Sequence, residues 1–220
     1  MSRVRIFDAD PSVQQKKFAD DDLVGRFRSG AQEGGRPRAL TEWRITTGDP
    51  DVAAQVHDLY GGDAPSTWDT KTEENLEVYT EQSSIDIILD GPNAVKVGMV
   101  LWGRKGKLRE CDGITQKDGS ACVCPSTVKE RKEAAAAGTG CDPSIMVFFR
   151  LADAPEMGKF RFITGSWSML REIGDAQDKL DEIDGPALCT LTLKPVEFES
   201  GGVKRSFTKP VLTVKGPADE

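Results

Sequence analysis

The sequence has a single histidine among 220 residues, and this scarcity limits the chemistry that the chain can perform. A site with two histidine ligands is excluded. His57 falls on the apolar edge of an expected helix, where we expect a surface or hydrogen-bonded side chain. The chain also lacks the G-x-x-x-x-G-K-[ST] phosphate loop and a dinucleotide-binding glycine motif that follows a strand. These absences argue against an enzyme.

Long apolar stretches are absent as well. No run approaches the ~20 residues that span a bilayer, and the N-terminal residues contain no apolar core of a secretion signal. We therefore expect no membrane association and a reducing, cytoplasmic location. The formal net charge of -7 argues against nucleic-acid binding through the overall charge, although a local basic patch stays open.

The sequence does contain many strand-like segments and two clear helices. Strand patterns of alternating or β-branched residues occupy 40–47, 76–80, 85–89, 97–102, 145–151, 159–164, 188–198 and 206–214. One helix is predicted where Asp49 caps a segment that begins with Pro50, and a second where Ser166 caps a segment that runs from Trp167 toward Ile183. We therefore predict an α+β fold, mainly antiparallel β-sheet with two or three helices.

Two passages share the order strand, Ile-Thr and glycine break, and helix: 41–62 and 159–178. Each is followed by a two-strand element, so a duplicated β-α-β-β unit and chance similarity both stay open. Residues 1–38 contain several glycines and no sustained periodicity, and we interpret them as an extended or partly disordered N-terminal arm. The α+β body is then expected at 39–220.

Four of the five cysteines lie within 31 residues, in the spacing C-x10-C-x-C-x16-C: Cys111, Cys122, Cys124 and Cys141. This concentration in a cytosolic chain favours tetrahedral zinc over disulfides, while disulfides, free thiols and another metal stay open. The segment has few apolar residues, so a metal would explain how it becomes ordered. We predict a zinc-binding insertion with four cysteine ligands at 103–142. The zinc is expected to be structural, because four cysteines leave no open coordination position.

Basic residues surround the cysteines, and their role stays open at this level: Arg104, Lys105, Lys107, Arg109, Lys129, Arg131 and Lys132. They could neutralise phosphates, offset the charge of a zinc–thiolate centre or simply solvate the surface. The phenylalanines of the strands at 145–151 and 159–164 could stack on bases, but core packing explains them better.

Short motifs along nearly the whole chain resemble a known family of phage proteins. They are VRIF at 4–7, GRFRSG at 25–30, ALTEWRITTGDPDVA at 39–53, NLEVYT at 75–80, MVLWGR at 99–104, FFRLA at 148–152, FRFITGSWSM at 160–169, IDGPALCTLTL at 183–193 and TKPVLTVKG at 208–216. As a set they are similar to the recombination directionality factors of actinobacterial temperate phages, which are partners of large serine integrases.

This resemblance implies a non-catalytic protein of the bacterial host cytoplasm that binds an integrase on att-site DNA, near its mobile coiled-coil. Such a factor switches the integrase from attP × attB integration to attL × attR excision and binds DNA little or not at all by itself. We expect the contact to involve Arg26, Phe27 and Arg28 of the arm, or Trp68. The alternative is a phage single-stranded-DNA-binding or replication accessory protein that uses the basic zinc segment and an aromatic sheet. A virion or host-takeover component is a third hypothesis.

Overall fold

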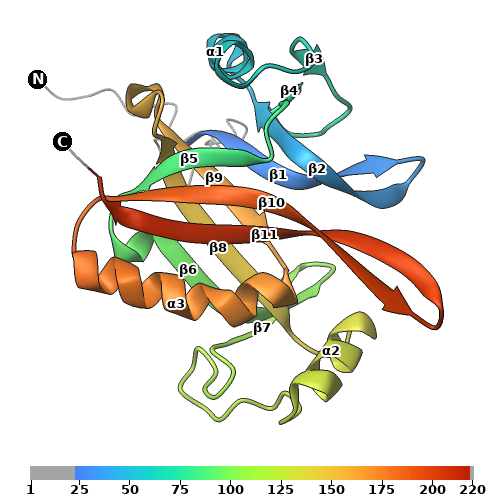
Figure 1. Ribbon diagram of the computed structural model, residues 1–220. Helices are drawn as coiled ribbons and strands as arrows, with labels where there is room; N and C mark the ends of the chain where they lie inside the picture. Colours follow the sequence, from blue (N-terminus) through green and yellow to red (C-terminus); the bar gives the residue numbers. More distant parts are fainter. Residues whose placement is uncertain (1–22, 219–220) are drawn as a thin grey trace, which may run out of the picture.

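Strands dominate the computed structural model of the protein, which describes residues 23–218 (Figure 1). In this part of the chain one curved sheet contains eleven strands: β1 (Leu23–Glu33), β2 (Arg36–Thr47), β3 (Ser66–Thr67), β4 (Leu76–Tyr79), β5 (Ser84–Leu89), β6 (Val95–Gly103), β7 (Gly106–Cys111), β8 (Asp142–Leu151), β9 (Lys159–Thr164), β10 (Ala187–Ser200) and β11 (Val203–Pro217). The helices are α1 (Pro50–Tyr60), α2 (Val128–Ala136) and α3 (Trp167–Ile183), with short 3-10 turns η1 (Pro92–Ala94) and η2 (Pro155–Met157).

The strand order along the sheet is β11-β10-β5-β8-β9-β1-β2-β4-β3, and β6 pairs with both β7 and β8. The pair β1–β9 is parallel, and the other pairs in the described part are antiparallel. The sheet curves enough to bring β10 and β11 into contact with β2. The predicted α+β class, mainly antiparallel, is therefore confirmed. None of the described helices is long and apolar enough to cross a bilayer.

Both predicted helix starts are present. Asp49 Oδ1 accepts hydrogen bonds from the backbone N–H groups of Asp51 and Val52, at 2.8 and 3.5 Å, and Pro50 occupies the first turn. The Ser166 hydroxyl accepts from the N–H of Met169 at 3.2 Å. These caps satisfy N–H groups that the first helical turn leaves unpaired. Each helix then buries one apolar stripe against the sheet.

The core lies on the inner face of the sheet, between the strands and helices α1 and α3. Phe27 is central to it, because its ring makes edge-to-face contacts with Trp43, Phe149 and Phe160 at centroid distances of 5.6, 5.1 and 5.5 Å. Phe162 is fully buried as well. The prediction that the strand phenylalanines serve core packing holds for these residues. Their geometry matches the offset that aromatic quadrupoles favour.

The prediction of an N-terminal arm at 1–38 needs correction for residues 23–38. Leu23–Glu33 form β1, which lies between β9 and β2 inside the sheet, and 36–38 begin β2. The partner strand β9 is more than 100 residues distant in sequence, so no local pattern could indicate the pairing. Residues 1–22 lie outside the described part of the chain.

The order strand, helix, strand, strand does occur twice, as β2-α1-β4-β5, with the short β3 inserted, and as β9-α3-β10-β11. The pairing of the two passages differs. Strand β4 pairs with β2 and β3, whereas β10 pairs with β11 and β5. The two passages therefore share a local order of elements and occupy different positions in the sheet.

Candidate functional site

The cysteine segment leaves the sheet after β7 and returns at β8, with α2 in between (Figure 1). Both ends flank the same residue, because Met99 of β6 pairs with Cys111 on one side and with Pro143 on the other. The part of the predicted insertion 103–142 that lies outside the sheet is therefore 112–141. Thr127 begins α2 by accepting from the Glu130 N–H at 3.3 Å, and its hydroxyl donates to the Glu130 carboxylate at 2.7 Å.

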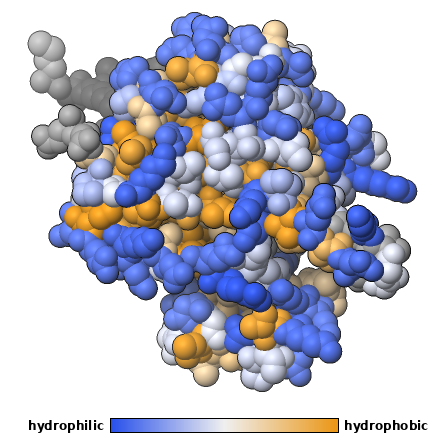
Figure 2. Space-filling model, viewed as in Figure 1, coloured by the Kyte–Doolittle hydropathy of each residue, from blue (hydrophilic) through white to orange (hydrophobic). Residues whose placement is uncertain are grey.

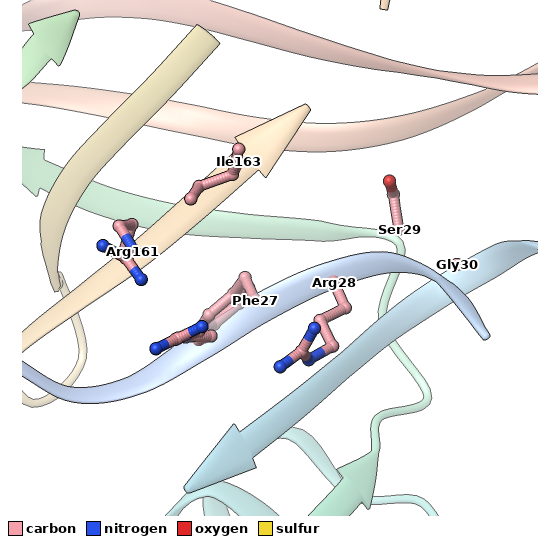
Figure 3. Close-up of a pocket in the computed structure, with 7 residues that line it drawn as sticks. Phe27, Arg28, Ser29, Gly30, Arg161 and Ile163 are labelled. Atoms are coloured by element: carbon pink, nitrogen blue, oxygen red, sulfur yellow. The ribbon is translucent and has the colours of Figure 1, made fainter. Parts of the chain in front are cut away.

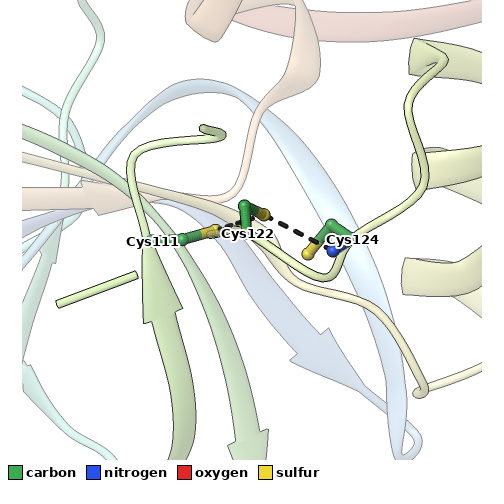
Figure 4. Close-up of side chains that lie close together, drawn as sticks. All are labelled: Cys111, Cys122 and Cys124. Carbon is green, nitrogen blue, oxygen red and sulfur yellow. Dashed lines mark hydrogen bonds between the residues drawn. The ribbon is translucent and has the colours of Figure 1, made fainter. Parts of the chain in front are cut away.

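Three of the four predicted ligands converge (Figure 4). The sulfurs of Cys111, Cys122 and Cys124 all lie within 4.8 Å of one another. The Cys111 and Cys122 sulfurs are 3.4 Å apart, and the Cys124 N–H donates to the Cys122 sulfur at 3.4 Å. Thiolates at ~2.3 Å from a tetrahedral zinc ion lie ~3.8 Å from one another. The spacing therefore suits a metal ion and is too long for a disulfide of ~2.05 Å.

The fourth predicted ligand, Cys141, lies in the same small apolar cluster as Met99 and Cys111 and is 2% exposed. Arg109 holds it from the side, with a hydrogen bond to the Cys141 sulfur that raises the pKa of the guanidinium. Arg109 also donates from Nη2 to the Thr139 carbonyl at 3.1 Å. The four cysteines thus form a cluster that could hold a metal ion, with a positive charge beside it.

Burial is the main reason that the pKa of the Cys111 thiol rises to about 12, and the neighbouring Cys122 adds to the shift. Metal binding requires the thiolate form, so a cation that binds here must displace protons from the sulfurs. All five cysteines are free thiols in the structure, and Cys189 is buried separately in β10.

Polar contacts, rather than an apolar core, shape the rest of the segment. Asp112 Oδ1 accepts from the N–H groups of Ile114 and Thr115, both at 2.7 Å. Arg131 of α2 donates to the Pro125 and Gly113 carbonyls at 2.6 and 2.8 Å. Apolar side chains point outward instead: Ile114 is 81% exposed, Val123 64% and Val128 58%. Figure 2 shows hydrophobic residues at the surface of this lower part of the molecule.

The second candidate region is the outer face of β9, β1 and β2. Successive strand residues point to opposite faces, so the core residues Phe160, Phe162 and Phe27 leave Arg161, Arg26 and Arg28 on the outside. The register places Arg161 beside Arg26, and Arg28 beside Arg44 of β2. Figure 3 shows Arg161 and Arg28 on neighbouring strands of this face.

A carboxylate and an indole ring partner two of these arginines. Glu74 accepts from Arg26 at 2.6 Å and from Arg28 at 3.4 Å. The guanidinium of Arg28 lies 5.4 Å from the centroid of the Trp68 ring, and the Trp68 indole donates to the Glu74 carbonyl at 2.7 Å. Partial burial lowers the pKa of Arg28, while Glu74 acts in the opposite direction.

Two hollows lie on this face. One, of about 250 Å³, is lined by Arg26, Arg28, Arg161 and Ile163 together with Phe27, Ser29 and Gly30 (Figure 3). The other, of about 750 Å³, includes Arg28, Arg38, Arg44, Trp68 and Tyr79. The face therefore combines cationic, aromatic and apolar surface within one concave region.

Of the four residues predicted to contact a partner, Arg26, Arg28 and Trp68 are brought together here. Phe27 is not available, because its ring is 2% exposed and points into the core, and we correct that prediction. Sequence reasoning missed Arg161 and Ile163. The alternation in KFRFIT carried the signal, since it places both residues opposite the buried Phe160 and Phe162. His57 lies half-buried on α1, at the edge of its apolar face.

Comparison with known proteins gives one family. The family model Gp3-like, described as "Recombination directionality factor-like", matches residues 24–215, a span that contains the cysteine segment and nearly all of the sheet. No solved structure matches the chain.

Proposed function

Since the chain belongs to the Gp3-like, recombination directionality factor-like family, whose members are regulatory accessory proteins rather than typical catalysts, we propose that it directs a large serine integrase. In this proposal it binds the integrase on att-site DNA, near the coiled-coil, and switches it from attP × attB integration to attL × attR excision. The family match over 24–215 is the observation that carries the proposal.

The physical basis would be differential binding. An integrase whose coiled-coils populate two arrangements changes its preference only if the factor binds one arrangement more tightly than the other. To reverse a 99:1 population, that difference must reach ~10⁴-fold in affinity. A surface with preformed contacts supports such a role, because ordered side chains lose little entropy on binding. The face with Arg26, Arg28 and Trp68 is ordered by Glu74 in this way.

We also propose that the metal of the cysteine cluster is Zn²⁺, held by Cys111, Cys122, Cys124 and Cys141. The soft thiolate donor set and the separation of the three converging sulfurs support this assignment. Bound zinc would supply a structural crosslink. The chain's own residues then connect the end of β7, at Cys111, with the start of β8, just after Cys141.

The direct test is reconstituted recombination with the purified integrase of the same phage genome, on attL × attR and attP × attB substrates. We expect excision only when the protein is present, together with suppression of integration. The integrase alone, and the protein with a catalytically inactive integrase, serve as controls and should give no excision product. Excision that is equally efficient without the protein would refute the proposal.

The alternative, a single-stranded-DNA-binding accessory protein, has one supporting observation. Phe148 of β8 is half-buried on the outer face, with Lys96 Nζ 4.8 Å from its ring centroid. Phe149, Phe160 and Phe162 are buried and offer no stacking surface. A gel shift with bare oligonucleotide separates the two functions: salt-sensitive binding without integrase supports the alternative, and a shift that requires integrase supports the regulator.

A further inference from the structure

The outer face of β9, β1 and β2 gathers four arginines on a protein whose net charge is -7. We define the arginine face by Arg26, Arg28, Arg44, Arg161, Ile163 and Trp68. Glu74 and Glu77 form ion pairs with Arg26, Arg28 and Arg44. Two carboxylates thus stand among four guanidinium groups. A cationic surface on an acidic protein marks the side on which an anionic partner is attracted.

The position of the arginines strengthens this argument. Arg26 and Arg161 are paired directly across β1 and β9, and adjacent strands are ~4.8 Å apart. Like charges directly opposite each other destabilise a sheet. A partner carboxylate placed over this pair would contact both guanidinium groups at once and would offset their repulsion.

The composition of the face favours a protein partner over DNA. Arginine and tryptophan are among the residue types most enriched at binding hot spots, and Ile163 adds apolar surface that is 47% exposed. Glu74 and Glu77 lie among the arginines, where they would repel a phosphate backbone. The two hollows give this face the concave shape that receives protruding side chains of a partner protein.

We infer that the arginine face is the docking surface for a carboxylate-bearing, partly apolar surface of the integrase protein itself. The inference rests on the proposed function and deepens it, because it identifies the chemistry of the contact and adds Arg161 and Ile163 to it. The attraction between opposite charges makes the association faster and sensitive to salt, while Ile163 and Trp68 supply apolar area.

The test measures binding of the full-length protein to the intact integrase in the absence of DNA, at low and moderate salt. Arg161→Glu reverses one charge on the face. The matched control is Arg171→Glu on the exposed side of α3, which makes the same change of total charge on a helix that packs against the opposite, core side of the sheet. We expect Arg161→Glu to weaken binding by about tenfold or more, equal to ~1.4 kcal/mol, and to reduce its salt dependence. Arg171→Glu should stay within about twofold of the wild type.

Ile163→Ser is the second variant, because it removes apolar area without a change of charge, and thermal unfolding checks that each variant is folded. We expect it to weaken binding several-fold with an unchanged salt dependence. Wild-type affinity in both face variants would overturn the inference. So would a loss that appears only when DNA is present, because the face would then contact DNA. If the wild type itself fails to bind the integrase, the proposed function fails before any variant is compared.

Discussion

The guanidinium of Arg44 lies 4.5 Å from the centroid of the Trp68 ring while its Nε donates to Glu77 Oε2 at 2.6 Å. Arg44 belongs to β2, Glu77 to β4, and Trp68 to the segment between α1 and β4. The arginine therefore connects this segment to the sheet, and Trp68 is held in a fixed orientation. An ordered tryptophan on a surface is a stronger anchor for a partner than a mobile one.

The ion pair between Arg44 and Glu77 should be important for stability, because both side chains are largely buried, at 8% and 15% exposed. Glu77→Ala leaves a buried guanidinium without its carboxylate, and we expect it to lower the free energy of unfolding by about 3 kcal/mol. Urea unfolding measures this. The exposed pair Arg38–Glu33, at 56% and 72%, gives the control: Glu33→Ala should change stability by less than about 0.5 kcal/mol. Equal effects of the two variants would contradict this explanation.

Phe27 should behave as a core residue rather than a contact residue. Phe27→Ala removes the ring that contacts Trp43, Phe149 and Phe160, and we expect a loss of about 3–5 kcal/mol. Denaturant unfolding checks the loss, and Phe27→Leu, which keeps most of the volume, should recover more than half of it. An Ala variant with wild-type stability that has lost only integrase binding would restore Phe27 as a contact residue.

Much of this fold could be predicted from the sequence where local chemistry decides it. Asp49-Pro50 and Ser166 start helices because capping depends on neighbouring residues alone. Strand β1 could not be predicted in this way. Its inward positions are Gly25 and Phe27, its outward ones Arg26 and Arg28, and only pairing with the remote β9 makes that segment a strand. The same distance in sequence hid the contribution of Arg161 to the candidate partner surface.

The cysteine cluster gives a prediction about metal content. We expect the purified protein to contain about one zinc ion per chain, and Cys124→Ser to lose most of it, because a thiolate ligand is removed. Elemental analysis of the dialysed protein measures both. Cys189→Ala is the control, since Cys189 lies in β10 outside the cluster, and it should retain the metal. Equal zinc content in Cys124→Ser and wild type would exclude the proposed site.

Asp86 makes stability depend on pH. Hydrogen bonds from Lys215, at 2.8 Å, are the main reason that the pKa of Asp86 is lowered, and Thr190 adds to the shift. A lowered folded-state pKa stabilises the protein above the ordinary carboxyl pKa of ~3.9, and this contribution is lost as the pH falls through the lower folded value. Solvent screens the exposed pair, so Asp86→Asn should destabilise by less than about 1 kcal/mol at pH 7.

The difference between Asp86→Asn and wild type should shrink as the pH falls from about 4 toward 2, which urea unfolding at several pH values can follow. Lys215→Gln serves as the partner variant. The double variant Asp86→Asn with Lys215→Gln should be no less stable than the sum of the single losses predicts. A pH-independent difference would show that the carboxylate charge is not the cause.

The pairing of Met99 with both Cys111 and Pro143 has a consequence for the architecture as a whole. The two points where the chain departs and rejoins are separated by two strand spacings, roughly 10 Å, and a turn of a few residues can bridge that gap. Residues 112–141 thus form an exchangeable cassette on a scaffold that does not depend on them for its strand pairing. Proteins that share this scaffold are free to lengthen, shorten or omit the cassette while the rest of the sheet stays unchanged.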